Sequence, residues 1–151
     1  MLGALLALTA CGDSSVPSAP QAGHEPRIET FAGTGNSGLG AEGVDPRKSE
    51  LYLPQDVTIG PDGRAYILDW NNHRIRVVEE GVIRTLVGSG GLGDAPAGPA
   101  LEVSFNHPTH VTFDPLGRLI ISAWHNSKIL RYDFLTERVE PICGTGVREY
   151  N

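Results

Sequence analysis

The sequence predicts an all-β protein in which the same small sheet is built more than once. Residues 54–78 align without a gap onto residues 108–132, and ten of the 25 positions are identical. A second phrase occurs three times, as IETFAGTG at 28–35, IRTLVGSG at 83–90 and VEPICGTG at 139–146. The chain is therefore a tandem array, and each motif has to be interpreted within its repeat.

Each repeat consists of short apolar runs that alternate with turn formers. Four runs of the first repeat are rich in β-branched and aromatic residues, as strands are: QDVTIG (55–60), RAYILD (64–69), HRIRVVE (73–79) and VIRTLVG (82–88). Tight turns at 61–63 (PDG) and 115–117 (PLG) favour antiparallel neighbours. We therefore expect two four-stranded antiparallel sheets, at about 54–87 and 108–143, and no long helix.

The central strands predict how the sheets are arranged. AYILD (65–69) and LIISA (119–123) are apolar on both faces, so each sheet needs a neighbour on either side. Stacking of four-stranded sheets around an axis gives a β-propeller. Residues 28–32 match the fourth strand of a repeat, and we expect them to form one orphan strand.

The repeated pattern resembles a known family. It reads Pro-x-x-Val-x-x-x-Pro-x-Gly-x-x-x-Ile-x-x-Trp-x-Asn, followed by NHRI at 72–75 in the first copy and NSKI at 126–129 in the second. This is similar to the NHL repeat, and the resemblance covers residues 28–151. It implies a propeller, usually of six blades. With two complete blades, the chain is expected to be a fragment of a longer ring, and assembly of several short chains is the alternative that we rank lower.

The N-terminal residues resemble a bacterial lipoprotein signal. Residues 1–11 are apolar and too short to span a bilayer, and they end in Leu-Thr-Ala-Cys, which is similar to a lipobox. No Lys or Arg precedes the apolar run, and Cys11 in an ordinary leader is the alternative. We expect lipid attachment at Cys11, a disordered linker at 12–27 that is rich in Pro, Ser and Gly, and a protein held at the bacterial cell envelope, periplasmic or extracellular.

The net charge bears on the class of partner, and the cysteines bear on disulfide formation. The net charge is −6 and no basic stripe is present, which argues against nucleic acid. Cys143 takes the position of Ala32 and Val87 in the other copies, so we expect a small buried apolar residue. With Cys11 acylated, no structural disulfide is expected.

Four residues are candidates for a site on the propeller face. The first strand of each blade lines the central channel, so His110 and its repeat equivalent Asp56 should lie side by side there. They could begin a zinc or calcium site, which takes three or more ligands, or could simply bind water and loop backbone, which we favour. Trp70 and Trp124 could form a platform for a protein, peptide or glycan, or could pack over their own blades, which we also favour.

Other motifs give weaker evidence for a functional site. Two glycine-rich phrases, at 33–38 and 88–93, fit G-x-G-x-x-G, but no credible helix follows to hold a dinucleotide. His107 and His110 have the spacing of a metal pair, and FNHPTHV at 105–111 is similar to zinc-binding segments of amidating lyases. His73 and His125 are expected in turns. No serine or cysteine nucleophile motif is present.

These observations favour a non-enzymatic, lipid-anchored binding or scaffolding module outside the cytoplasm. The alternative is a metal-dependent propeller enzyme that resembles an amidating lyase or a lactonase and uses Asp56 and His110 as partial ligands. A third possibility is that the chain has no independent function.

Replacement of Cys11 by Ser tests the anchor. Because the thiol is the acylated group, the variant should lose fatty-acid labelling in a bacterial host and should move from the membrane fraction to the aqueous fraction. Labelling that persists in the variant would contradict attachment at Cys11. Cys143→Ser is the matched control and should keep the label.

Overall fold

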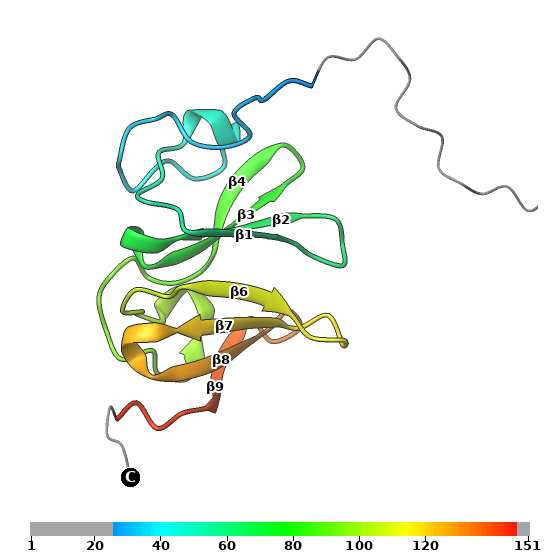
Figure 1. The fold of residues 1–151 in the computed structure, drawn as a ribbon. Helices are drawn as coiled ribbons and strands as arrows, with labels where there is room; N and C mark the ends of the chain where they lie inside the picture. Colours follow the sequence, from blue (N-terminus) through cyan, green and yellow to red (C-terminus); the bar gives the residue numbers. More distant parts are fainter. Residues whose placement is uncertain (1–25, 148–151) are drawn as a thin grey trace, which may run out of the picture.

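The computed structural model describes residues 26–147, which form two antiparallel sheets stacked face to face (Figure 1). The first sheet has the order β1 (Asp56–Ile59), β2 (Ala65–Asp69), β3 (Arg74–Glu79), β4 (Val82–Val87). The second has the order β5 (Gly98–Pro99), β9 (Arg138–Cys143), β8 (Lys128–Asp133), β7 (Leu119–Ala123), β6 (His110–Phe113). The predicted all-β propeller fold, with two blades, is confirmed.

The helices in the described range are single 3-10 turns. They are η1 (Pro46–Lys48), η2 (Trp70–Asn72), η3 (Ala100–Glu102) and η4 (Trp124–Asn126). The predicted signal at 1–11, with Cys11, and the linker up to residue 25 lie outside the described residues.

Within residues 26–147, none of the helices has the length and apolar character that crossing a membrane requires.

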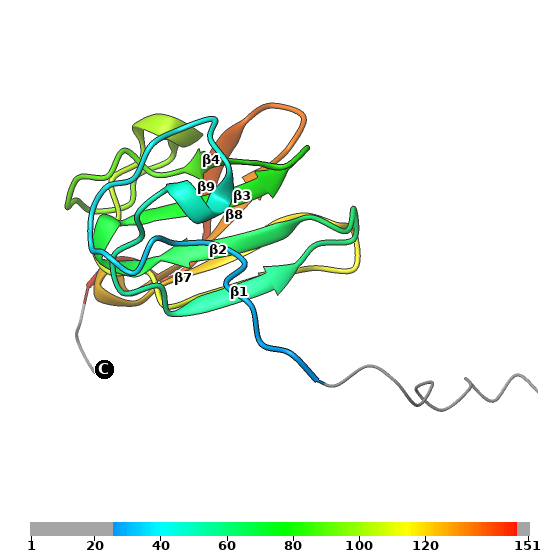
Figure 2. The ribbon, with the colours of Figure 1, turned by 90° about the horizontal axis from the view of Figure 1, so that it is seen from above.

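The two blades repeat in register. Asp56 pairs with Leu68 in the first blade, and His110 pairs with Ser122 at the equivalent place in the second. Both blades also carry an irregularity at the start of the third strand, between Ile75 and Arg76 and between Ile129 and Leu130. Seen from above, the strands of one blade lie over their equivalents in the other (Figure 2). Aligned sequence positions therefore occupy equivalent places in space.

The connection before each blade adds a short segment to the outer strand, which the sequence did not predict. In the second blade this segment is β5, which pairs Gly98 with Val139. In the first blade Val44 forms an isolated bridge with Ile83. The outer edge of each blade is thus partly covered by its own incoming chain, which reduces the exposed strand edge.

Two local expectations were wrong. Residues 28–32 are not assigned to a strand, because no third strand of their own repeat lies beside them in the described part of the chain. Cys143 is exposed rather than buried, because it ends β9 on the outward side of the second blade, where the described residues place no further sheet.

The main core lies between the blades. We call the side of the first blade that faces the second its trailing face: Tyr66, Leu68, Ile75 and Val77. The opposing side of the second blade is its leading face: Val111, Leu119, Ile121 and Leu130. All eight side chains are almost completely buried. Full burial of an aliphatic side chain contributes about 1.5–3 kcal/mol, so this contact dominates the stability of the pair.

Truncation of Ile121 to Ala tests that contact. The side chain is fully buried between the sheets, so its loss should lower the free energy of unfolding by about 2–5 kcal/mol in chemical denaturation. Leu135→Ala is the control, since that side chain is 93% exposed and its loss should change stability by less than about 0.5 kcal/mol. Equal effects of the two substitutions would contradict the stacked arrangement.

Candidate functional site

The repeated WNNHR/WHNSK phrase forms a tight turn at one end of each blade. Each Trp begins a 3-10 turn, η2 or η4, which closes on a residue with left-handed backbone: His73 at φ 52° and Ser127 at φ 50°. The two turns lie at the same end of the stacked sheets, at the left in Figure 1. The left-handed position is the residue after the Asn of the phrase in both copies.

The Asn of the phrase binds the connection that enters its own blade. Asn72 donates from Nδ2 to the carbonyl of Gly38 at 2.7 Å, and Asn126 donates to the carbonyl of Gly93 at 2.6 Å. Both Asn side chains are buried, so these bonds satisfy groups that would otherwise lack a partner. The phrase recurs because every blade needs its incoming loop held against its turn.

The basic residue two positions later makes the same kind of contact. Lys128 donates from Nζ to the carbonyl of Asp94 at 2.6 Å, and Arg74 donates to the carbonyl of Leu39. In the first blade a second basic residue, the fully buried Arg76, lies 3.1 Å from Glu42 of the incoming loop. Burial and the nearby charge of Arg74 lower the pKa of the Arg76 guanidinium. The glycine-rich phrases are thus loops held by the following blade, and their role here is structural.

The turns of the two blades meet in a cluster of aromatic and imidazole rings, which we call the rim cluster: Trp70, His73, His107, Trp124 and His125. The ring of His107 lies 4.5 Å from Trp70, 4.6 Å from His73 and 5.0 Å from His125, between ring centroids. Trp124 lies 4.0 Å from His125. His107, from the connection before β6, therefore joins the turn of one blade to the turn of the other.

Hydrogen bonds fix the imidazoles of this cluster. The backbone N–H of His107 donates to Nδ1 of His73 at 3.3 Å, so neutral His73 carries its hydrogen on Nε2. Oδ1 of Asn106 accepts from Nδ1 of His107 at 2.7 Å and from Nδ1 of His125 at 3.2 Å. Burial, with the charge of His107, lowers the pKa of His73, and burial, with the charge of His125, lowers the pKa of His107.

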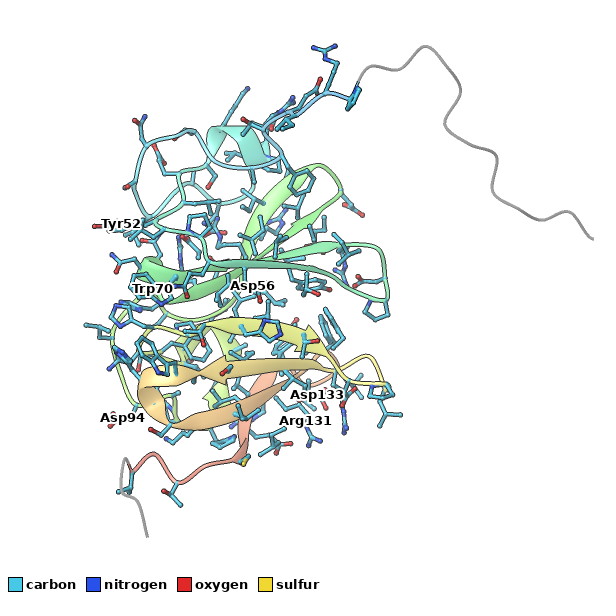
Figure 3. All side chains as sticks on the ribbon, in the orientation of Figure 1. Tyr52, Asp56, Trp70, Asp94, Arg131 and Asp133 are labelled. Carbon is cyan, nitrogen blue, oxygen red and sulfur yellow. The ribbon has the colours of Figure 1, made fainter. Side chains whose placement is uncertain are left out.

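Asp56 and His110 form a second contact between the blades. Oδ2 of Asp56 lies 2.6 Å from Nδ1 of His110 and also accepts the backbone N–H of Val111 at 3.0 Å. The carboxylate is mostly covered, whereas the His110 side chain is 62% exposed. Asp56 at the start of β1 pairs with Leu68, two residues before Trp70, and lies inward from Trp70 along the strands (Figure 3). Repeat register alone placed this pair side by side, and the structure does the same.

The four sequence-predicted candidates separate into two groups: Asp56 and His110 contact each other, and Trp70 and Trp124 belong to the rim cluster. Trp70 contacts His107 from the connection into the next blade, and Trp124 stays 57% exposed beside its own His125. His107 and His110, considered together as a metal pair, have different neighbours. Among residues 26–147, no group of three His, Cys, Asp or Glu side chains is placed to hold a metal ion. Asp56 and His110 by themselves provide two ligands.

Sequence reasoning missed the rim cluster, although a signal for it was present. His107 is the repeat equivalent of Leu53 in the connection before a blade, and His73 follows the Trp turn. His125 follows the Trp of the second turn. All three positions map to one end of the blades, so the presence of three histidines at that end was predictable. Their mutual contact was not, because it depends on how far one blade is turned relative to the next.

The match to a family model agrees with the repeat architecture. Residues 51–78 match the model of the NHL repeat. Over 127 residues, 77% of this chain, the sequence is 30% identical to Protein SUPPRESSOR OF QUENCHING 1, chloroplastic, of Arabidopsis thaliana, of which the match spans 12%. A crystal structure of a protein of unknown function from Bacteroides thetaiotaomicron is 21% identical, with a TM-score of 0.48, and the match covers 56% of this chain and 22% of that one.

Acid should loosen the rim cluster. The folded-state pKa of His73 lies below its ordinary value of 6.5, so the unfolded chain binds more protons as the pH falls below that value. The contribution of this group to stability is thus present above pH 6.5 and declines as the pH falls through the lowered pKa. Thermal unfolding of His73→Asn, which keeps a left-handed residue in place, should show a smaller loss of Tm between neutral and mildly acidic pH than the wild type.

The matched control is Ser127→Asn, which introduces the same residue at the equivalent left-handed position of the second blade. It should retain the pH dependence of the wild type. An unchanged pH profile in His73→Asn would show that this imidazole does not couple the blades to pH.

Proposed function

We propose that the chain is a protein-binding module held outside the cytoplasm by a lipid on Cys11, with the rim between the blades as its contact surface. Protein binding, the general part of this proposal, is supported by the match to the NHL repeat, since domains of this repeat commonly mediate protein binding. The anchor is supported by the lipobox-like residues 8–11 and the polar linker that follows them.

The observation that carries the choice of surface is the exposed Trp124 at the end of a fixed aromatic and imidazole cluster. Its ring lies 4.0 Å from that of His125 between centroids, tilted by 47°, and 57% of the residue is exposed. A large aromatic side chain that is partly immobilised by a neighbouring ring contributes much contact area and loses little conformational entropy on binding, which is typical of interaction hot spots. His110 and Asp56 add a polar group and a carboxylate for hydrogen bonding.

The chemistry of the rim favours a peptide segment as ligand. Imidazole and indole rings provide flat apolar faces, Asn106 is bonded to two of the imidazoles, and His110 with Asp56 adds further polar groups. The net charge of −6 makes an acidic partner unfavourable at long range. A neutral or basic peptide is therefore the ligand class that the surface fits best.

Selection from a random peptide library on the immobilised chain tests the surface. Selected peptides should bind Trp124→Ala about tenfold or more weakly than wild type, because truncation of a hot-spot aromatic removes most of its contact area. Leu135→Ala, far from the rim on the β8–β9 turn, is the control and should bind normally. Peptides that bind Trp124→Ala and His110→Ala as tightly as wild type would contradict the rim as contact surface, and binding restricted to glycans would contradict the ligand class.

A metal-dependent enzyme is the second candidate, and one observation favours it. The 2.6 Å contact of Asp56 with the exposed His110 places two residues that can coordinate zinc or calcium at the propeller face. Two ligands fall short of the three or more that such sites use, so further groups would have to come from outside residues 26–147.

Metal analysis separates the two functions. For a binding module, we expect zinc and calcium equilibrated with the purified 151-residue chain to be removed by dialysis, with no change in peptide binding. Stoichiometric metal that survives dialysis in the wild type and is lost in His110→Ala would contradict the binding module and support the enzyme.

A further inference from the structure

The two outward faces of the molecule are repeat equivalents of the faces already joined inside it. The internal interface joins the trailing face of the first blade to the leading face of the second. The first blade also has a leading face, on which Val57, Ile59 and Ile67 are the equivalents of Val111, Phe113 and Ile121. The second blade has a trailing face, on which Ile120 and Ile129 are the equivalents of Tyr66 and Ile75. Each outward face thus matches one half of an interface that the structure shows in its joined form.

The leading face of the first blade is apolar and open along β1, whereas Ile67 on β2 and Arg76 on β3 are buried beneath the incoming connection, Arg76 against Glu42. Val57 is 59% exposed, whereas its equivalent Val111 is fully buried, and Ile59 is 64% exposed. Leu53, the equivalent of His107, is also exposed. A groove of about 460 Å³ runs along this face and is lined in part by Phe31, Leu51, Val57 and Ile67.

The trailing face of the second blade carries the complementary features. Trp124 is exposed, whereas its equivalent Trp70 is held against His107. Ile120 and Ile129 are partly exposed, whereas Tyr66 and Ile75 are fully buried. Ser122, Trp124, Ile129 and Cys143 line a shallow hollow of about 250 Å³ on this face.

We propose that the trailing face of the second blade binds the leading face of the first blade of another copy of this chain. If the internal register is repeated, Trp124 of one copy stacks on Leu53 of the next, as Trp70 stacks on His107. Ile120 then lies opposite Ile59, as Tyr66 lies opposite Phe113 at 4.9 Å between ring centroids. This pairing goes beyond the proposed function and does not rest on it, but the two compete for Trp124, so a second copy and a bound peptide exclude one another at that side chain.

Hydrogen-bond complementarity between an imidazole and a carboxylate favours a second copy as the occupant. Inside the molecule, Asp56 of one blade contacts His110 of the next at 2.6 Å. In a head-to-tail pair, His110 of one copy comes to Asp56 of the following copy, so the two residues alternate along the axis. A partner with a second Asp at this place would bring two carboxylates together, and one with a second His would bring two imidazoles together.

Three polar substitutions make the outward interface weaker than the internal one. On the trailing face of the second blade, Ser122 and Arg131 stand where the first blade has Leu68 and Val77, and on the leading face of the first blade Arg76 stands where the second has Leu130. Arg131 is already bonded to Glu140 on its own blade. Its equivalent Val77 lines an open cleft of about 380 Å³ between the blades, so Arg131 keeps access to water in the docked pair. The expected association is therefore concentration dependent, and it is heterologous, adding copies in one direction until a ring closes.

Light scattering after size-exclusion chromatography tests this inference on the 151-residue chain carrying Cys11→Ser, so that no lipid contributes to association. The parent chain should elute with a mass above that of the 16.1 kDa monomer, rising with protein concentration. Ile59→Lys blocks the leading face and Ile120→Lys blocks the trailing face, so each variant alone should be monomeric. Leu135→Lys, at an exposed turn, is the matched control and should associate like the parent chain.

A mixture of the two blocked variants is the decisive sample. The trailing face of Ile59→Lys and the leading face of Ile120→Lys are both intact, so the mixture should form a one-to-one dimer and nothing larger. Circular dichroism and thermal unfolding check that each variant is folded. A folded parent chain that stays monomeric at millimolar concentration, or a mixture that stays monomeric, would overturn the proposal. Peptide binding at the rim is measured on the same monomeric variants, so loss of association and loss of the proposed function are distinguishable.

Discussion

Burial of one sheet face against the next is the constraint on which the rest of the structure depends. The middle strands are apolar on both sides, and a single sheet with such strands would expose one of its faces to water. Pairing the trailing face of the first blade with the leading face of the second removes eight apolar side chains from water and fixes the relative orientation of the two sheets. The rim cluster lies at the end of this interface, and both it and the Asp56–His110 contact exist only because the faces are joined.

The repeated phrase has a second role, which is to attach each blade to the chain that enters it. The Asn and the basic residue that follows it bind carbonyls of the incoming glycine-rich loop, and the contact is the same in both blades. The loops lack regular structure, so their backbone groups need such partners. The first blade adds the Arg76–Glu42 contact, whereas Leu130 takes the place of Arg76 in the second blade and joins the core between the blades. The same turn therefore tolerates either a buried ionic contact or an apolar one beneath it.

Repeat register explains why so much of this arrangement was predictable from sequence. Alignment of the copies gave the strand runs, the turns, the stacking of the sheets and the neighbouring positions of Asp56 and His110, because equivalent positions occupy equivalent places. Register could not give contacts that depend on how far one blade is turned relative to the next. The three-histidine cluster is such a contact, and His73, His107 and His125 stand where the other copy has Ser127, Leu53 and Asn71. The short outer segments at Val44 and β5 were missed because their partners come from irregular loops, and the exposed Cys143 was missed because equivalence of position does not guarantee an equivalent neighbour.

The most direct test of the stacked pair is a nuclear Overhauser measurement between the aromatic rings of Tyr66 and Phe113. These residues belong to different blades and are far apart in sequence, and their ring centroids lie 4.9 Å apart in an edge-to-face arrangement. The account predicts strong cross-peaks between the two rings, and further cross-peaks from Tyr66 to Phe134 at 6.1 Å between ring centroids. Absence of cross-peaks between these rings in a folded sample would show that the two sheets do not pack face to face, and would contradict the account at its base.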